Sequence, residues 1–308
     1  MEGNVLITGG AGNLARVVAE ELRGDYSVTL FDRCSPADAR VPWETDLPFV
    51  LGDLTSLGDC IRAVAFSEAG IVIHLGALPG PSELMRYPRA QQRMPEDETM
   101  RVNTMGTFYI ADAARRLGVQ KVLFASTYYV LGLGNRIGDA PFRVDYLPID
   151  GDHPARPEST YGLSKLLGEQ ILAAFSRAYG MNAVVFRLMG LTFPHRESGW
   201  FHVPVSPEGK ADHRGGPIGT TWQYLDARDV ALACRLALKA DNLDPFEILY
   251  LSTDTMLSED TAEVVARTCP ELQPLAEKLR GKEGMISISR AENKLGYSPQ
   301  HSWRLSED

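Results

Sequence analysis

The stretch VLITGGAGNLARVVAEEL (residues 5–22) decides the fold. A β-branched run leads into glycines at positions 9, 10 and 12, and apolar residues at helical spacing follow, so we predict a strand, a tight turn and a helix. Gly9 and Gly12 allow the backbone to approach a diphosphate that would bind at the positive N-terminus of the helix. Ala15 takes the last small position, where helix and strand pack closely. The segment therefore predicts a strand–turn–helix unit that binds a dinucleotide.

A carboxylate follows about 20 residues later. TLFDR ends a second expected strand with Asp32, which can accept hydrogen bonds from both ribose hydroxyls and would repel a 2′-phosphate. NAD is therefore expected as the cofactor rather than NADP. Arg33 leaves the second option open, because a guanidinium can bind a phosphate. Asp53, just beyond a further strand end, is expected near the adenine amino group.

The rest of the chain repeats the alternation of short apolar runs and helical patterns. This alternation predicts a parallel sheet covered on both faces, an α/β fold of the Rossmann-type doubly wound kind. Residues 1–188 are expected to form the NAD-binding domain, and 189–308 mainly a smaller C-terminal substrate-binding domain, with a strand at 247–252 returning to the main sheet. The expected strands are 4–8, 27–31, 49–52, 71–75, 121–125, 183–188 and 247–252, and the expected helices are 14–22, 100–118, 161–180 and 227–240. Loops 79–97 and 131–160 interrupt the pattern, and loops of this length are usually functional or mobile.

The composition excludes several classes of partner. The net charge of −9 disfavours a general affinity for nucleic acid, and no apolar run is long enough to suggest a membrane span. Four cysteines and six histidines are dispersed without the spacing of a metal site, so no metal is expected. MEGNVLITGG enters an expected strand without a charged leader, and we expect a cytoplasmic protein.

The segment YGLSK (161–165) offers a pair of chemically active side chains. Residues i and i+4 share one helix face, so Tyr161 and Lys165 point the same way. An ammonium group near a phenol stabilises the phenolate and lowers the phenol's pKa, which would make the pair an acid/base device. The alternative is the first turn of a helix with one aromatic residue in the core.

The glycine loop, GDL (52–54), HLGAL (74–78), Asn103 and YGLSK occur in an order that resembles the extended short-chain dehydrogenase/reductase family. The resemblance covers nearly the whole chain and implies that Tyr161 is the catalytic acid/base, and that Lys165 holds the nicotinamide ribose and lowers the pKa of the tyrosine. FASTYYVLG (124–132) matches the family segment that carries the catalytic hydroxyl, which is then Thr127, with Ser126 beside it. Asn103 matches a helix asparagine that supports the cofactor region. The expected cofactor contacts are Gly9, Gly12, Asn13, Leu14, Asp32, Arg33, Asp53, Leu54, Leu75, Gly76, Ala77, Asn103, Ala125, Tyr161, Lys165 and Leu188.

Departures from the family pattern narrow the expected reaction. Dehydratases of the family carry Asp-Glu after the catalytic threonine, where this chain has Tyr128 and Tyr129, so dehydration is disfavoured. RLMGLTFP (187–194) has Gly190 where nucleotide-sugar enzymes have a diphosphate-binding asparagine. With TTWQYLDARDV (220–230), these segments look more like uronate-dehydrogenase-type members, which oxidise a free sugar acid. The expected substrate contacts are Leu78, Thr127, Tyr128, Gly190, His195, Arg196 and Arg214.

Alternatives stay open for several of these residues. His195, Arg196 and Arg214 can meet a carboxylate or phosphate, or belong to a solvated charged loop. Tyr128 and Trp222 can pack against a sugar or in the core.

The leading hypothesis is an NAD-dependent oxidoreductase acting on a carbinol carbon of a sugar or sugar acid. The second is a nucleotide-sugar epimerase that retains its NAD, and the third is a non-catalytic protein that senses the dinucleotide. The family also implies a homodimer formed through helices 100–118 and 161–180.

Overall fold

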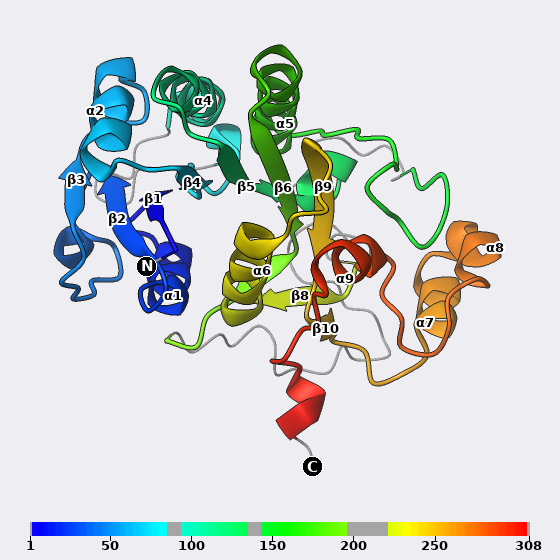
Figure 1. Ribbon diagram of the computed structural model, residues 1–308. Coiled ribbons are helices and arrows are strands. Elements are labelled where there is room, and N and C mark those ends of the chain that lie inside the picture. Colours follow the sequence, from blue (N-terminus) through cyan, green and yellow to red (C-terminus); the bar gives the residue numbers. More distant parts are fainter. Residues whose placement is uncertain (1, 85–93, 135–142, 196–220, 307–308) are drawn as a thin grey trace.

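The computed structural model describes residues 2–84, 94–134, 143–195 and 221–306 (Figure 1). Its centre is a seven-stranded sheet in the order β3-β2-β1-β4-β5-β6-β9, and every neighbouring pair is parallel. These strands are β1 Asn4–Thr8, β2 Ser27–Asp32, β3 Phe49–Leu51, β4 Ile71–His74, β5 Lys121–Thr127, β6 Asn182–Leu188 and β9 Phe246–Leu251. The predicted parallel sheet is confirmed. The strand order reverses between β1 and β4, and ligands of open α/β sheets bind beyond the carboxyl ends of the strands at this point.

Helices cover both faces of this sheet. α1 (Asn13–Leu22) contacts α6 (Ala227–Lys239) on one face, and α2 (Leu57–Ser67), α4 (Gly106–Arg116) and α5 (Thr160–Tyr179) pack side by side on the other (Figure 1). Because strand side chains alternate between faces, Val5 and Ile7 of β1 join the hydrophobic cluster under α1 and α6, and Leu6 joins the cluster under α2, α4 and α5. The sheet is therefore a doubly wound one with two cores.

A second group of elements follows β6. β7 (Gly190–Thr192) pairs parallel with β8 (Gln223–Asp226), and β10 (Asp254–Thr255) pairs antiparallel with β8. Helices α7 Thr261–Thr268, α8 Gln273–Ala276 and α9 Ser289–Leu295 also belong to this part of the described chain, whereas the short α3 Glu98–Met100 precedes β5. Short 3-10 segments lie at Pro36–Asp38, Ser82–Leu84, Tyr128–Leu131, Pro270–Leu272 and Trp303–Ser306. β9, from this part of the chain, adds to the main sheet beside β6. The domain boundary at residue 188 stays a prediction.

Three local features differ from the predicted elements. α2 was not predicted, because its buried stripe is built partly from the small or polar residues Cys60, Ala63 and Ser67. The helix expected at 100–118 contains a π-helical turn, Arg101–Met105, between α3 and α4. β5 continues through Thr127, two residues beyond the expected strand end. Within the described residues, no helix combines the length and the apolar character needed to cross a membrane.

Candidate functional site

The glycine loop, residues 9–12, joins β1 to α1 through very close backbone contacts. Gly9 has φ +70°, and a Cβ there would lie 2.7 Å from the Cα of Gly76, which follows β4. A Cβ on Gly12 would lie 2.9 Å from the carbonyl oxygen of Gly9. Gly12 is the N-cap of α1, and among the described residues no side chain caps this helix terminus. The loop is thus a narrow cradle at a positive helix end, which fits the diphosphate of a dinucleotide.

Asp32 lies at the carboxyl tip of β2, beside this loop. Its carboxylate accepts hydrogen bonds from the backbone N–H groups of Ala11 (3.0 Å) and Arg33 (2.6 Å). Burial raises the pKa of Asp32, and the N–H bonds oppose that rise. The Arg33 side chain is exposed. Asp53 accepts hydrogen bonds from the backbone and hydroxyl of Thr55, both at 2.8 Å.

Asn103 lies in the π-helical turn and connects two parts of the site. Its amide accepts a hydrogen bond from the N–H of Leu78 (2.8 Å) and donates to the carbonyl of Leu78 (3.2 Å) and to Ser164 Oγ (3.0 Å). Ser164 in turn donates to the carbonyl of Tyr161 (2.8 Å). We call Leu78, Asn103 and Ser164 the Asn103 bracket, since it ties the segment after β4 to helix α5. In this arrangement Asn103 supports the site through protein contacts.

Thr127 and Tyr161 meet at the carboxyl edge of the sheet. Thr127 ends β5, and Tyr161 lies in the first turn of α5, which Ser159 caps through a hydrogen bond from Gly162 N–H. Burial raises the pKa of Tyr161 and the nearby Tyr129 adds to the rise, whereas the bond to Thr127 lowers it. Burial is the largest cause of the shift, and the expected effect of Lys165 on the pKa of Tyr161 stays a prediction.

Lys165 lies one turn along α5 with 3% of its surface exposed. Its Nζ donates to the carbonyl of Ala125 on β5 (2.7 Å) and lies 4.8 Å from the centre of the Phe124 ring. Burial lowers the pKa of Lys165 to about 7, against the opposing effect of Glu169. The lysine is consequently poised to change its charge near neutral pH.

A buried ion pair lies one further turn along the helix. Arg187 on β6 binds Glu169 through two N–H groups, at 3.0 and 2.8 Å, and donates to Tyr250 Oη at 3.0 Å. Ser126 Oγ donates to the same carboxylate at 2.5 Å. The carboxylate thus has several donors, as burial of a charge requires. The sequence analysis noted Arg187 and Ser126 but missed Glu169; its position four residues after Lys165 is the signal that could have found it.

The described residues among the expected substrate contacts have different surroundings. Tyr128 and Trp222 are each only 4% exposed and belong to the hydrophobic core. His195 Nε2 lies 3.2 Å from Asn13 Oδ1 at the start of α1, next to the glycine loop, and its contact with substrate stays a prediction. Arg196 and Arg214 lie outside the described residues.

Further expected contacts line the carboxyl edge. Leu188 ends β6 opposite Thr127, and Gly190 begins β7. Leu75 donates its N–H to the carbonyl of Thr8, the residue before the glycine loop, at 3.3 Å. Leu54 packs against Gly76, where a Cβ would lie 2.6 Å from the Leu54 Cδ1. Of the other expected cofactor contacts, Asn13 and Leu14 open α1, Ala77 follows Gly76, and Ala125 lies in β5.

Glu83 was not predicted from the sequence. From the 3-10 segment Ser82–Leu84 its carboxylate accepts hydrogen bonds from the backbone N–H (2.9 Å) and the hydroxyl of Thr160. It therefore anchors loop 79–97 to the turn of α5 that carries Tyr161. Residues 85–93 of that loop lie outside the described residues.

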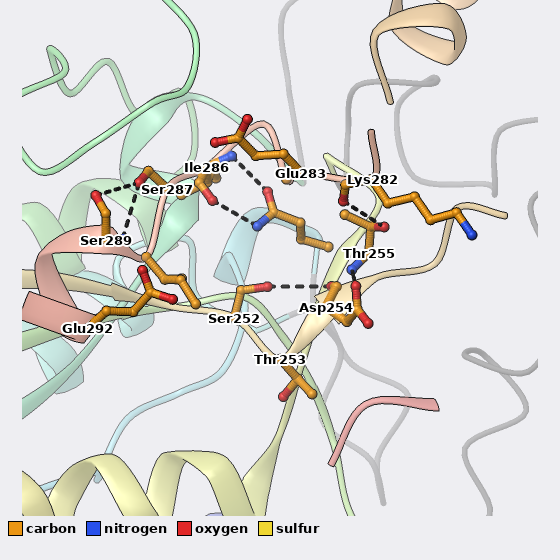
Figure 2. Close-up of a pocket in the computed structure, with 13 residues that line it drawn as sticks. Ser252, Thr253, Asp254, Thr255, Lys282, Glu283, Ile286, Ser287, Ser289 and Glu292 are labelled. Carbon is orange, nitrogen blue, oxygen red and sulfur yellow. Dashed lines mark hydrogen bonds between the residues drawn. The ribbon is translucent and has the colours of Figure 1, made fainter. Parts of the chain in front are cut away.

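Figure 2 shows a pocket of about 270 Å³ beyond the end of β9. Its wall includes Gln223, Ser252–Thr255, Lys282–Gly284, Ile286–Ser289 and Glu292. Gln223 bridges the N–H and carbonyl of Ile286, at 2.8 and 2.9 Å, so its amide is held by the wall itself. Neither Tyr161 nor Thr127 lines this pocket. In the part of the chain that the structure describes, no cluster of His, Cys, Asp and Glu could hold a metal ion.

Comparisons with known proteins show which family the chain is similar to and which solved structures share its fold. The model of the NAD dependent epimerase/dehydratase family matches residues 5–252. A uronate dehydrogenase from Pseudomonas putida is 30% identical over 195 residues, 63% of this chain and 63% of that protein, so the match spans less than two thirds of that relative. A UDP-glucose 4-epimerase from Corynebacterium glutamicum is 25% identical over 97% of this chain and 91% of its own length. The crystal structure of a UDP-glucose 4-epimerase with UDP-glucose from Thermotoga maritima has a TM-score of 0.67 and 22% identity, covering 97% of this chain and 94% of that one, and it shows a shared fold.

Proposed function

The chain belongs to the NAD-dependent epimerase/dehydratase family, and from this premise we propose that it is an NAD-dependent dehydrogenase that oxidises a carbinol carbon of a sugar or sugar acid. The observation that carries the proposal is the placement of Thr127 at the end of β5 next to Tyr161 in the first turn of α5, with the buried Lys165 one helical turn away. The likeness to a uronate dehydrogenase favours a sugar acid as the substrate class.

The three side chains have distinct proposed roles. Tyr161 exchanges a proton with the substrate hydroxyl oxygen, and Thr127 hydrogen-bonds the same oxygen and orients it. Because the pKa of Tyr161 is raised, the phenol holds its proton at neutral pH and is ready to donate it. Oxidation of an alcohol needs the phenolate, and the ammonium form of Lys165 stabilises that charge from one turn away.

The glycine loop and Asp32 are proposed to hold the dinucleotide. The loop's close contacts with Gly76 exclude larger side chains, so the diphosphate would lie against backbone at the N-terminus of α1. Asp32 would accept hydrogen bonds from the adenosine ribose, exchanging its bond with Ala11 N–H for hydroxyl donors. NAD supplies the hydride acceptor when it is bound.

The test is Tyr161→Phe, which removes one hydroxyl and keeps the ring. We expect loss of turnover with NAD binding retained, because the phenol oxygen serves the proton transfer. Tyr179→Phe, at the exposed far end of the same helix, is the matched control and should keep the wild-type rate. Near-normal turnover by Tyr161→Phe would refute the assignment.

An epimerase is the second candidate, favoured by the relative that aligns over 97% of this chain. Such an enzyme returns the hydride to its substrate and keeps NAD bound, so no NADH accumulates. A panel of aldoses, uronates, polyols and nucleotide sugars, followed for both NADH and epimeric product, separates the two functions. Stoichiometric NADH from a uronate supports the dehydrogenase, and an epimer without NADH supports the epimerase.

A homodimer is proposed through α4 and α5. These helices and the adjoining π-helical turn expose large apolar side chains, namely Met105, Phe108, Leu163 and Tyr179. Exposed large apolar side chains on two packed helices are typical of association surfaces. Phe108→Glu with Leu163→Glu should give a monomeric mass by light scattering, whereas Phe66→Glu, on the exposed part of α2, should leave the dimer intact. A monomeric wild type would overturn this proposal.

A further inference from the structure

His74 ends β4 and is fully enclosed, yet the proposed mechanism does not use it. The side chain is 1% exposed, and both ring nitrogens have hydroxyl partners. Nδ1 lies 2.6 Å from Thr8 Oγ1 on β1, and Nε2 lies 3.1 Å from Thr107 Oγ1 on α4. The ring stacks on Phe124, with centroids 5.6 Å apart. A polar ring in such a place needs both its hydrogen bonds.

The neighbouring bonds determine which nitrogen carries the proton. The Thr107 hydroxyl donates its one hydrogen to the carbonyl of Asn103 (2.7 Å), so its oxygen must accept from the His74 Nε2–H. Nδ1 is then an acceptor and receives the hydroxyl hydrogen of Thr8. Thr8 Oγ1 in turn accepts from the N–H of Gly76 (3.1 Å). The four hydrogen bonds form one chain, in which each group donates to the next from the N–H of Gly76 to the carbonyl of Asn103.

This chain joins the two halves of the proposed site. Thr8 precedes Gly9 of the glycine loop, and the chain ends on Asn103 of the Asn103 bracket, which holds Leu78 and helix α5 beside Tyr161. Helix α5 also packs closely against two residues that contact His74. A Cβ on Gly168 of this helix would lie 2.6 Å from Phe124 Cζ and 3.4 Å from Thr107 Oγ1. The ring therefore lies between the expected cofactor loop and the helix that carries the proton-transfer groups.

We propose that His74 is a positioning residue whose neutral, Nε2-protonated ring couples the geometry of the glycine loop to that of the catalytic helix through Thr8, Thr107 and Asn103. Only the effect of this coupling on catalysis rests on the proposed function. The hydrogen-bond chain itself does not depend on it, and NAD binding alone can report it.

The surroundings of the ring keep it neutral. Burial, together with the smaller effect of the Lys165 charge on α5, lowers the pKa of His74 to about 3. The groups that face the ring from β1 and α4 are the hydroxyls of Thr8 and Thr107, and β5 contributes the Phe124 ring. A second proton, at Nδ1, would force the Thr8 hydroxyl to accept two bonds and to direct its own hydrogen elsewhere in a fully buried site.

The first test is nitrogen-15 NMR of the imidazole groups in the wild-type protein, with His74→Gln used to assign the resonances. We expect a protonated Nε2 and an unprotonated Nδ1 for His74, unchanged from about pH 5 to about pH 9. An Nδ1-protonated tautomer, or titration of the ring within that range, would overturn the proposal. This measurement needs neither substrate nor turnover, so it stands even if the proposed reaction is wrong.

The second test asks whether Thr8 and Thr107 act as one unit. Thr8→Val and Thr107→Val each remove a hydroxyl and keep the shape, and each should weaken NAD binding about tenfold, as expected when a buried partner is lost. Both hydroxyls act through His74, so losing the second should add nothing to the loss of the first. The Kd for NAD of the double variant, measured by calorimetry, should therefore be about tenfold above that of the wild type, as in each single variant. Effects that multiply to about a hundredfold would mean that the two hydroxyls act independently.

Thr107→Ser supplies the matched control for this cycle. It keeps the hydroxyl between His74 and Asn103 and should bind NAD within about twofold of the wild type. If it is as weak as Thr107→Val, the hydroxyl is not the cause and the coupling is refuted. Should the valine variants not fold, the NMR result on the wild-type protein decides the tautomer on which the proposal stands.

Discussion

Replacing Lys165 with methionine should change how the stability of the protein depends on pH. The pKa of Lys165 is lowered from 10.5 to about 7 in the folded state, chiefly by burial. Between those values the unfolded chain binds a proton that the folded chain does not, so the free energy of unfolding rises with pH in this window. Below pH ~7 the folded protein must bury the charged lysine, and its free energy of unfolding is lowered by the full cost of that burial. This cost disappears as the pH approaches ~10.

The magnitude follows from the linkage relation. One pKa unit corresponds to about 1.4 kcal/mol, and the folded lysine is still half protonated at pH ~7, so the wild type should gain about 2 kcal/mol between pH ~7 and pH ~9 relative to Lys165→Met. Methionine keeps a long flexible chain and carries no charge, so its fold lacks this pH-dependent contribution. The hydrogen bond of the neutral amine to Ala125 is the same across the window and cancels from the difference.

Urea unfolding of both proteins at half-unit pH steps measures this difference. All other titrating groups are shared, so subtraction isolates Lys165, and equal m-values confirm that the same surface unfolds. Lys278→Met, at an exposed position after α8, is the control and should give a curve parallel to the wild type. If the curve of Lys165→Met is parallel as well, the lysine is not held at a lowered pKa and the reasoning fails.

Three further outcomes follow from the site. Gly9→Ala should lower the free energy of unfolding by about 1–3 kcal/mol in urea titrations, because φ is +70° and the new Cβ meets the backbone at 2.7 Å; Gly24→Ala, which meets nothing within 4 Å, should not. Glu169→Gln leaves Arg187 buried without a charged partner and should cost about 3–5 kcal/mol by the same assay, and a variant within about 1 kcal/mol of the wild type would contradict the structural role of the pair. Asp32→Ala should shift the ratio of kcat/KM for NADP over NAD upward by about tenfold, since the repulsion of a 2′-phosphate is removed; an unchanged ratio would show that Asp32 does not read the ribose.

The parts of the fold that could be predicted are those that local chemistry determines. The glycine spacing after a β-branched run predicted the β1–α1 unit, and Gly9 has the left-handed backbone that this spacing suggests. The i, i+4 spacing likewise predicted that Tyr161 and Lys165 share helix α5. In these cases every residue that matters lies within one or two turns of chain.

The parts that could not be predicted depend on residues far apart in the sequence. The His74 chain needs Thr8, 66 residues earlier, and Thr107, 33 residues later, and no periodicity marks those hydroxyls. The raised pKa of Tyr161 follows from how deeply the folded chain buries the phenol, which the sequence pattern does not contain. The contact of His195 with Asn13 joins residues 182 positions apart, and no local pattern marks it.

Burial is the main cause of the shifted pKa values of both Tyr161 and Lys165. It raises the pKa of Tyr161 and lowers that of Lys165, so both side chains favour their neutral forms. Glu169 opposes this for Lys165, but its carboxylate is already bound by Arg187 and Ser126, which leaves it less able to hold the lysine charged. Because Arg187 already neutralises Glu169, this carboxylate raises the pKa of Lys165 less than an unpaired Glu169 would. Lys165 can therefore change its charge near neutral pH. Arg187 thus bears on the proposed acid/base chemistry through its ion pair with Glu169, which lies one turn after Lys165.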